Sequence, residues 1–339
     1  MTDDILEDDD LLFAEAEMPE IFVSRAVLER MKRGALLYPH EETGEALVGV
    51  RMENGKRGVP FIYLLETIPP MQNVVRQWAH FSQGDDWQGA IFNWLSENWE
   101  VYRELRRRSY GKTNAAKWDL PLEHVGDWHK QPGMVEPSGA DYRTAKQFLK
   151  DNDLSFIVTP IVTFAHEANY APIEANTLIF TDISPAVRVD FWGLGRRDRN
   201  FIPLKPVPSH LPLLPAVVWW LHDSTRMDLE VAALEKEGLN VMDIVQYNVD
   251  GMPPLETCFV IYRPGSKKAI LAITPHNYPK QKPAWRLASL QIPKEGEGLF
   301  EILYKKSEAV PSSALAGWSG DSHALLDGIR LIEKYLENQ

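Results

Sequence analysis

The sequence predicts an α/β protein of the α+β type with two domains. The chain has 339 residues, of which 44% are hydrophobic and 10% aromatic, and this composition suffices for two separate cores. Helical and strand patterns occur in both halves, and a proline-rich segment separates them. Its prolines are Pro203, Pro206, Pro208, Pro212 and Pro215. Such a segment is semi-rigid, so it is either a spacer between the domains or a proline arm packed on one of them.

We expect a flexible acidic tail over residues 1–19, a first domain over residues 20–195, the proline-rich connection over residues 196–222 and a second domain over residues 223–339. The tail is rich in Asp and Glu, which is typical of segments without a packed core. Three apolar residues in it could still dock as a short linear motif: Leu11, Leu12 and Phe13.

The first domain opens with a helix and two strands. Ser24 can cap a helix that runs to about Arg33, because Val27, Leu28 and Met31 then fall on one side. Strands are predicted over residues 47–51 and 61–65, on either side of a turn at Asn54-Gly55.

The remaining elements of this domain follow from periodicity. Residues 87–105 have helical spacing, with apolar positions at Ile91, Trp94, Trp99 and Tyr102. A strand that carries His129, a helix over residues 142–150 and an apolar strand over residues 156–163 come next.

The segment from 126 to 141 is the most informative about function. It reads Gly-Asp-Trp-His-Lys-Gln-Pro over residues 126–132 and Pro-Ser-Gly-Ala-Asp over residues 137–141. On a strand His129 and Gln131 point to the same face, so they can converge on one metal ion. His124 lies an odd number of positions before His129 and should face the other way. Ser138 and Asp141 also form a capping box, which explains both residues without any metal.

This segment resembles the signature of the JAMM/MPN+ metalloprotease family (the JAB or Mov34 domain), which is His-x-His-Pro, a short spacer and Ser-x-x-Asp. Gln131 stands where the family has its second histidine. Upstream, the chain has Glu-Thr-Gly-Glu-Ala-Leu-Val-Gly over residues 42–49, which matches the family's Glu-Thr-Gly-x-x-Leu-x-Gly. Only Glu42 directly precedes Thr-Gly, so Glu41 and Glu45 are rejected as the equivalent residue. The resemblance covers about residues 20–195.

The resemblance implies a mixed sheet with flanking helices and a zinc site with His129, Gln131 and Asp141 as ligands. Catalytic zinc typically has three protein ligands and a water molecule. Glu42 would take the proton from that water and pass it to the leaving amine, and Ser138 would support the oxyanion. An amide oxygen binds zinc more weakly than imidazole, so Gln131 leaves three accounts open: a variant that still holds metal, a pseudoenzyme, or a chain inactivated on purpose.

The second half predicts a helix followed by an antiparallel meander. Ser224 can cap a helix over residues 225–237. Strands are expected over residues 244–247, 257–262 and 268–274, joined by turns at Asp250-Gly251 and Pro264-Gly265. A final helix is expected over residues 321–337.

A Tyr-Pro-Lys-Gln-Lys-Pro segment over residues 278–283 follows the meander. It resembles the Tyr-Pro-x-x-x-Pro corner of ubiquitin-conjugating-enzyme-like folds, including the UEV and RWD relatives, although an ordinary rigid turn has the same composition. Trp318-Ser319 before the final helix extends this resemblance. A conjugating enzyme needs a thiol after the corner, whereas Cys258 precedes it in an apolar strand and is expected in the core. The resemblance therefore implies a binding domain of the UEV or RWD kind and not a transferase.

Composition excludes several classes of protein. The single cysteine rules out an internal disulfide and a Cys-rich zinc site, and it fits a reducing cytosol. No apolar run reaches about 18 residues, so we expect a cytoplasmic protein without a membrane partner. The net charge of −12 argues against a nucleic-acid partner. The one basic run is expected to be a solvated helix face or a docking site for an acidic partner: Arg103, Arg106, Arg107 and Arg108.

Together the two resemblances imply a zinc-dependent isopeptidase, similar to a deubiquitinase, that removes or processes a ubiquitin-like modifier, as in prokaryotic ubiquitin-like systems. Its expected partners are the modifier, its conjugates, and the activating or conjugating enzymes of the same system. The alternative is a catalytically inactive MPN/UEV-type scaffold, because each half lacks one chemical essential: the second histidine in the first, a suitably placed thiol in the second.

Overall fold

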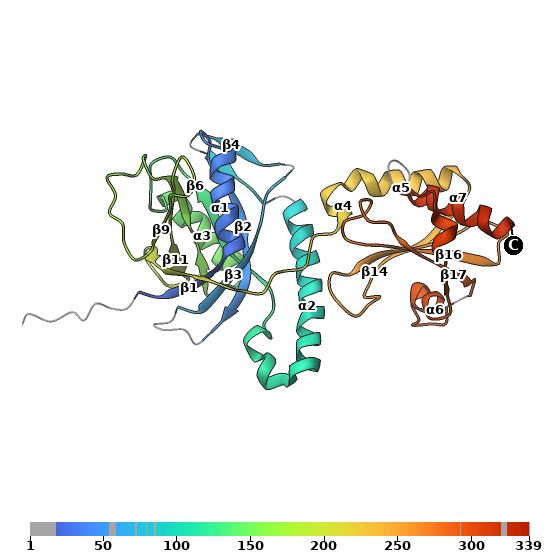
Figure 1. Cartoon of the computed structure of the whole chain (residues 1–339). Helices are drawn as coiled ribbons and strands as arrows, with labels where there is room; N and C mark the ends of the chain where they lie inside the picture. The colour runs from blue at the N-terminus through green and yellow to red at the C-terminus, as the bar shows by residue number, and fades with distance from the viewer. Residues whose placement is uncertain are drawn as a thin grey trace, which may run out of the picture. The chain divides into compact units, whose positions relative to one another are not determined.

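The computed structural model of the chain describes residues 18–53, 59–71, 73–78, 80–84, 86–291, 293–319 and 324–338. They form two compact units (Figure 1), one of Met1–Gly84 with Glu123–Pro212 and one of Asp85–Leu122 with Leu213–Gln339. Three sequence-based expectations lie outside the described residues: the acidic tail up to residue 17, the turn at Asn54-Gly55 and the start of the final helix at residue 321.

The first unit is built on a mixed sheet that contains eleven strands among the described residues. The main path runs β12-β11-β7-β6-β2-β3-β1-β13, while β8 pairs with β6 and continues through β10 to β9. Because β9 comes back against β13, the sheet is nearly closed. The strands are β1 (Glu20–Ser24), β2 (Thr43–Met52), β3 (Phe61–Ile68), β6 (Glu123–Lys130), β7 (Phe156–Val158), β8 (Ile161–Phe164), β9 (Thr177–Phe180), β10 (Val187–Asp190), β11 (Trp192–Gly195), β12 (Ile202–Pro203) and β13 (Lys205–Ser209).

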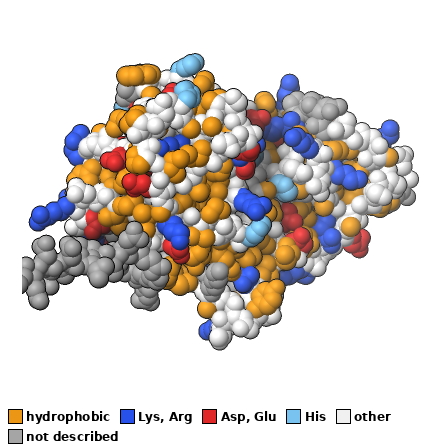
Figure 2. Space-filling model, turned by 60° about the vertical axis from the view of Figure 1, so that its left-hand side comes forward, with side chains coloured by type: hydrophobic (Ala, Val, Ile, Leu, Met, Phe, Trp, Pro, Cys, Tyr) orange, Lys and Arg blue, Asp and Glu red, His pale blue; other side chains and the backbone are white. Residues whose placement is uncertain are grey.

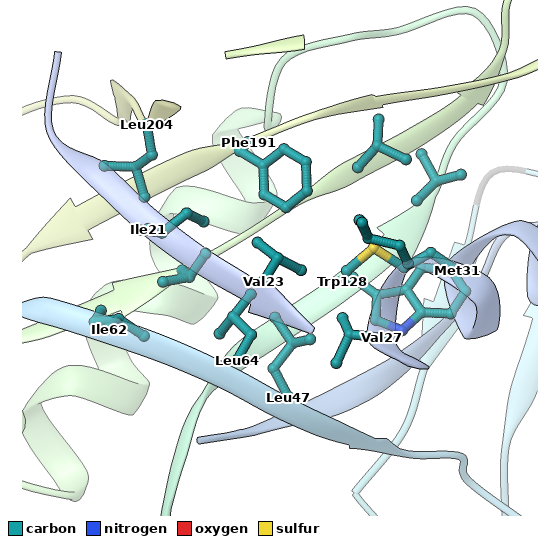
Figure 3. Close-up of a cluster of buried hydrophobic side chains, with 14 of the residues drawn as sticks. Ile21, Val23, Val27, Met31, Leu47, Ile62, Leu64, Trp128, Phe191 and Leu204 are labelled. Atoms are coloured by element: carbon teal, nitrogen blue, oxygen red, sulfur yellow. The ribbon is translucent and has the colours of Figure 1, made fainter. Parts of the chain in front are cut away.

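Helices cover both faces of this sheet. The helix α1 (Arg25–Leu37) begins at Ser24 as predicted, since the Ser24 hydroxyl accepts a hydrogen bond from the Val27 amide at 3.2 Å. Its apolar side packs on the main core, where Figure 3 shows Trp128 beside Val27 and Met31. The helix α3 (Gly139–Asp151) packs against the opposite face through Ala145 and Leu149. Residues that alternate along β6 therefore face either the α1 core or α3.

The apolar run over residues 156–163, expected as one strand, forms two strands. Pro160 has no N–H to donate, and the chain breaks out of the ladder at this point. The Thr159 amide donates instead to Trp192 O at 2.7 Å, and Pro160 O accepts from the His129 amide at 3.2 Å. Both β7 and β8 pair in parallel with β6, so the break lies beside the candidate site.

The proline-rich segment is a packed arm. Residues 202–209 form β12 and β13, and β13 pairs in parallel with β1 at the end of the main strand path. Proline is tolerated there because an edge strand needs fewer amide donors. Of the two alternatives left open by the sequence, the structure therefore has the proline arm on the first unit, up to Pro212.

The second unit contains a five-stranded antiparallel sheet whose strands follow chain order. They are β14 (Asn240–Tyr247), β15 (Glu256–Tyr262), β16 (Lys268–Thr274), β17 (Ala284–Ser289) and β18 (Glu308–Ala309). The predicted meander is confirmed and is extended by β17 and β18. Cys258 on β15 is buried, as expected for a core position.

Helices cover both faces of the meander (Figure 1). On one face, α6 (Leu299–Lys305) contributes Phe300 and Leu303 to a cluster with Cys258. On the other lie α4 (Trp219–His222), α5 (Ser224–Lys236) and α7 (Ala324–Glu337), where Trp220 Nε1 donates to Thr257 Oγ1 at 3.0 Å. The cap of α5 is Asp223, which accepts from the Arg226 amide, and not Ser224 as expected.

The long helix α2 (Asp86–Ala115), which is kinked at the non-helical Gly111, belongs to the second unit, whereas its sequence position suggested the first. Asn98 Oδ1 accepts a hydrogen bond from the Leu255 amide at 2.7 Å, and Trp94 Nε1 donates to Ala216 O at 3.0 Å. Helical spacing predicts that an apolar side is buried but not which sheet buries it, and this explains the difference.

A buried carboxylate joins three parts of the second unit. Glu230 of α5, almost fully buried, accepts hydrogen bonds from Arg226, from the Tyr278 hydroxyl and from the Leu325 amide at the start of α7. The segment with Tyr278-Pro279 lies between β16 and β17. This network fixes that corner against α5 and α7.

Candidate functional site

A bulge in β6 determines which side chains face α3. Leu47 of β2 pairs with Gly126 and Val48 pairs with His124, so Val125 is an extra residue in β6. Gly126 has φ 145°, and a Cβ there would lie 1.9 Å from Val158 O, so only glycine fits.

The bulge places His124 on the same face as His129, contrary to the sequence-based expectation of opposite faces. The His124 ring packs on Phe148 of α3 with 4.7 Å between centroids. Its Nε2 lies 3.0 Å from Asp127 Oδ1, which also accepts from Gln83 Nε2 at 2.7 Å. Because Asp127 and His124 are engaged with each other, neither is a ready substitute for a missing ligand.

His129 and Asp141 meet between β6 and the first turn of α3. His129 Nε2 lies 3.6 Å from Asp141 Oδ1. Two ligands of one tetrahedral zinc ion, with bonds of about 2.0–2.1 Å, would be about 3.3 Å apart. The spacing is therefore close to that of two ligands that share an ion, and longer than a good hydrogen bond.

Ser138 holds the other half of the Asp141 carboxylate. The Ser138 amide donates to Asp141 Oδ2 at 2.6 Å, and the Asp141 amide donates to Ser138 Oγ at 3.3 Å. This is the predicted capping box, and it is formed in full. One carboxylate oxygen closes the box while the other faces His129, so the cap and a metal-binding role are compatible.

Gln131 directly follows β6 and is buried, with 5% of its surface exposed. Its amide N–H donates to Val162 O at 3.1 Å, and its side-chain Nε2 donates to Glu136 O at 2.8 Å. The second bond ties the loop before Ser138 to the strand end and leaves the side-chain oxygen as the atom available to a metal. Over the described ranges, no group of three or more His, Cys, Asp or Glu residues could hold a metal ion, so His129 and Asp141 lack a third ligand of these types.

Glu42 precedes β2 and lies beside the end of β6. Its amide donates to Gln77 O at 2.7 Å in the hairpin of β4 (Val75–Gln77) and β5 (His80–Ser82). Gly44 pairs with His129, and a Cβ on Gly44 would lie 2.2 Å from Trp128 O, so the glycine lets the two strands approach. Burial raises the pKa of Glu42, the Asp141 charge raises it further, and Lys130 acts in the opposite direction. A carboxyl group with a raised pKa is suited to general base work.

The rejected alternative Glu45 faces away from this site. It accepts a hydrogen bond from Thr67 Oγ1, and its partner residue on β6 is Trp128, which points into the α1 core. Burial raises the pKa of Glu45, and the Thr67 hydrogen bond opposes that shift.

Lys130 was not singled out by the sequence, although it lies between two candidate ligands. It is 1% exposed, and its Nζ donates to Pro39 O at 3.1 Å and to Glu41 O at 3.2 Å. Burial lowers the pKa of Lys130, against the charges of Glu167, Glu42 and Glu41. Its position in the strand could have identified Lys130 as a buried lysine, because the residue between His129 and Gln131 must face the α1 core.

Two other features of the chain involve different residues from this site. A cavity of about 790 Å³ is lined by Phe156 at the start of β7 and by Arg196 and Arg197 after β11, at the other end of β6 from His129. The basic run of α2 is mostly neutralised, since Arg103 and Arg107 bind Asp119 and Arg108 binds Glu104.

On the face shown in Figure 2, acidic and basic side chains are interspersed. No described helix has both the length and the apolar character needed to cross a bilayer.

Comparisons with known proteins add little to this geometry. No family model matches the chain, and no curated protein matches it. Among solved structures, it is similar to the solution structure of protein DSY2949 from Desulfitobacterium hafniense, at 12% sequence identity and a TM-score of 0.29, over 57% of this chain and 94% of that one. A similarity of this size carries no argument about fold or function.

Proposed function

We propose that the first unit is a zinc-dependent isopeptidase domain of the JAMM/MPN+ type that removes or processes a ubiquitin-like modifier. The observation that carries the proposal is the 3.6 Å approach of His129 Nε2 to Asp141 Oδ1, with the other carboxylate oxygen held by the Ser138 amide. Glu42, half-buried beside the same strand end and with a raised pKa, supports it.

In this proposal His129, Asp141 and the side-chain oxygen of Gln131 would hold the zinc ion, which supplies a water molecule of lowered pKa and polarises the scissile carbonyl. Glu42 accepts a proton and delivers it to the leaving amine. The Ser138 hydroxyl, at the start of α3, supports the oxyanion. The capping box keeps Asp141 oriented throughout.

The second unit is proposed as a binding domain of the UEV or RWD kind. Its antiparallel meander and the corner at Tyr278-Pro279, held by Glu230, support this. Cys258 is buried on β15, and burial raises the pKa of its thiol far above the ordinary value, which argues against thioester chemistry. The proposed partners are the modifier, its conjugates and the enzymes of the same conjugation system, in the cytoplasm.

The second candidate is an inactive scaffold, and one observation favours it. The Gln131 amide already has a structural task, because it ties the loop at Glu136 to the end of β6. A glutamine that holds a loop in place is compatible with a site that keeps its structure but binds no metal. In that case the first unit would bind the modifier or the conjugation machinery without cutting.

The test compares three proteins: the chain itself, Gln131→His, and Gln131→His combined with Glu42→Ala. Ubiquitin with a fluorogenic amide at its C-terminus serves as the probe, and bound zinc per chain is measured in parallel. We expect Gln131→His to bind one zinc ion and cleave, because imidazole is the better ligand. Adding Glu42→Ala should leave zinc bound and lower the rate at least 100-fold, in the range typical of a lost general base.

The control is Glu45→Ala in the Gln131→His background, which changes a neighbouring, partly buried carboxylate that faces away from the site. Its rate should stay close to that of Gln131→His. If Gln131→His remains free of zinc and inactive, the isopeptidase proposal is wrong and the scaffold is favoured.

A further inference from the structure

The segment between α1 and β2 carries Glu42 but has no regular secondary structure of its own. It covers residues 38–42 and is followed by Thr43, the first residue of β2. A general base must keep a fixed position relative to the bound substrate, since small displacements cost large factors in rate. Something outside the segment must therefore hold it.

Lys130 supplies two of the contacts that hold it. From the core face of β6, its Nζ reaches the carbonyl oxygens of Pro39 and Glu41, the residue directly before Glu42. The ammonium group also lies 5.0 Å from the centre of the Phe164 ring. On the far side of the segment, the Glu42 amide is bound by Gln77 O.

Placing the ammonium group of Lys130 in the core lowers the stability of the fold unless its contacts compensate. Burying an ammonium group costs several kcal/mol unless hydrogen bonds compensate. Among the described residues its direct partners are two carbonyls and a ring, while the charges of Glu167, Glu42 and Glu41 act on it without direct contact. A leucine or methionine at this position of β6 would fill the core without that cost. Neither of those apolar residues could donate the hydrogen bonds to the carbonyl oxygens of Pro39 and Glu41.

We propose that Lys130 is a positioning residue, which ties the segment carrying Glu42 to the strand carrying His129 and Gln131. The catalytic part of this inference rests on the proposed function, in which Glu42 is the general base. The structural part, that Lys130 fixes residues 39–42, stands independently. A local pattern would not reveal it, because the contacts join residues on β6 to a segment that precedes β2.

The test uses the full chain with Lys130→Met, which keeps an unbranched side chain of similar length but removes the donors. Lys32→Met is the matched control, since Lys32 is also buried, at 6% exposure, and its Nζ also lies 5.0 Å from a ring centre, that of Phe180. Amide hydrogen exchange should rise at least tenfold at residues 40–43 in Lys130→Met and stay unchanged there in Lys32→Met. Unchanged exchange at Glu42 in Lys130→Met would overturn the proposal.

The kinetic constants kcat and KM distinguish a positioning role of Lys130 from a purely structural one. Lys130→Met is introduced into the protein that cleaves the probe, which is either the chain itself or Gln131→His. The substitution should lower kcat at least tenfold, leave KM within twofold and leave bound zinc unchanged. An unchanged kcat overturns the catalytic part. If no parent cleaves, the proposed function fails, and hydrogen exchange alone decides whether Lys130 positions the segment.

Should Lys130→Met fail to fold, the ammonium protons of Lys130 in the unsubstituted chain provide the measurement. Slow solvent exchange of these protons, in spectra of the ¹⁵N-labelled protein, is the expected result. Exchange as rapid as that of exposed lysines such as Lys236 would show that the two carbonyl contacts do not hold the ammonium group.

Discussion

At the scale of single residues, the site depends on glycines that let backbones approach each other. Gly44 brings β2 against β6 opposite His129, and Gly126 allows the bulge that sets which residues face α3. Neither glycine has a side chain that could bind a metal. Their effect on the site is through the spacing of the strands that carry Glu42 and His129.

Gly44→Ala tests this spacing. The new Cβ would meet Trp128 O, so the strands must separate, and we expect a loss of about 1–3 kcal/mol in the free energy of unfolding, as for other overpacked positions. Zinc affinity should fall as well. Gly89→Ala is the control, since Gly89 is exposed on α2 with nothing within 4 Å of the added Cβ. It should be neutral or stabilising in urea unfolding.

Glu45 gives a pH-dependent prediction. Burial raises its pKa in the folded state above that of the unfolded chain, so the folded state binds the proton more tightly. The resulting stabilisation is fully present below the unfolded pKa and is lost as pH rises through the folded pKa. Glu45→Gln keeps an acceptor for Thr67 and should remove this loss, so the variant should equal or exceed the parent in stability at pH 7 in urea titrations. A large destabilisation at pH 7 would contradict the account.

At the scale of elements, sequence patterns agree with the structure where the residues that determine an element lie within a few positions of one another. The caps at Ser24 and Ser138 and the strand over residues 268–274 could be predicted, because a cap or a short apolar run is contained within a few residues. The bulge at Val125 and the break at Pro160 were missed, since both depend on neighbouring strands. The same limitation hid Lys130, whose partners precede β2.

The Glu230 network is the strongest element-scale test in the second unit. Glu230→Ala leaves Arg226, the Tyr278 hydroxyl and the Leu325 amide without their shared acceptor. We expect a loss of about 3–5 kcal/mol in the free energy of unfolding, as for other broken buried pairs. Glu235→Ala, on the exposed side of α5, should stay within about 0.5 kcal/mol of the parent. Equal effects of the two substitutions would refute the role given to Glu230.

At the scale of the whole molecule, the two units are interleaved in sequence. The chain passes between them after Gly84, Leu122 and Pro212, because α2 is inserted between β5 and β6 of the first unit's chain but packs in the second. Its buried residues include Trp94 and Trp99. A boundary drawn only at the proline-rich segment therefore misses a helix of the second unit.

Fragments test this interleaving. Residues 213–339 alone should unfold at a lower urea concentration than a chain that adds residues 85–122 through a linker, because the partners of α2, such as the Leu255 amide, lose their contacts. A helix peptide of residues 86–115 added in trans should partly restore the midpoint. Equal midpoints with and without α2 would contradict its assignment to the second unit.

The most direct test of the proposed zinc site is X-ray absorption at the zinc edge on Gln131→His, with bound zinc counted per chain. The account predicts one zinc ion with nitrogen and oxygen ligands at about 2.0–2.1 Å, no sulfur, and loss of the ion in Asp141→Ala. A chain free of zinc, or an ion that persists without Asp141, would contradict a metal centre between β6 and α3.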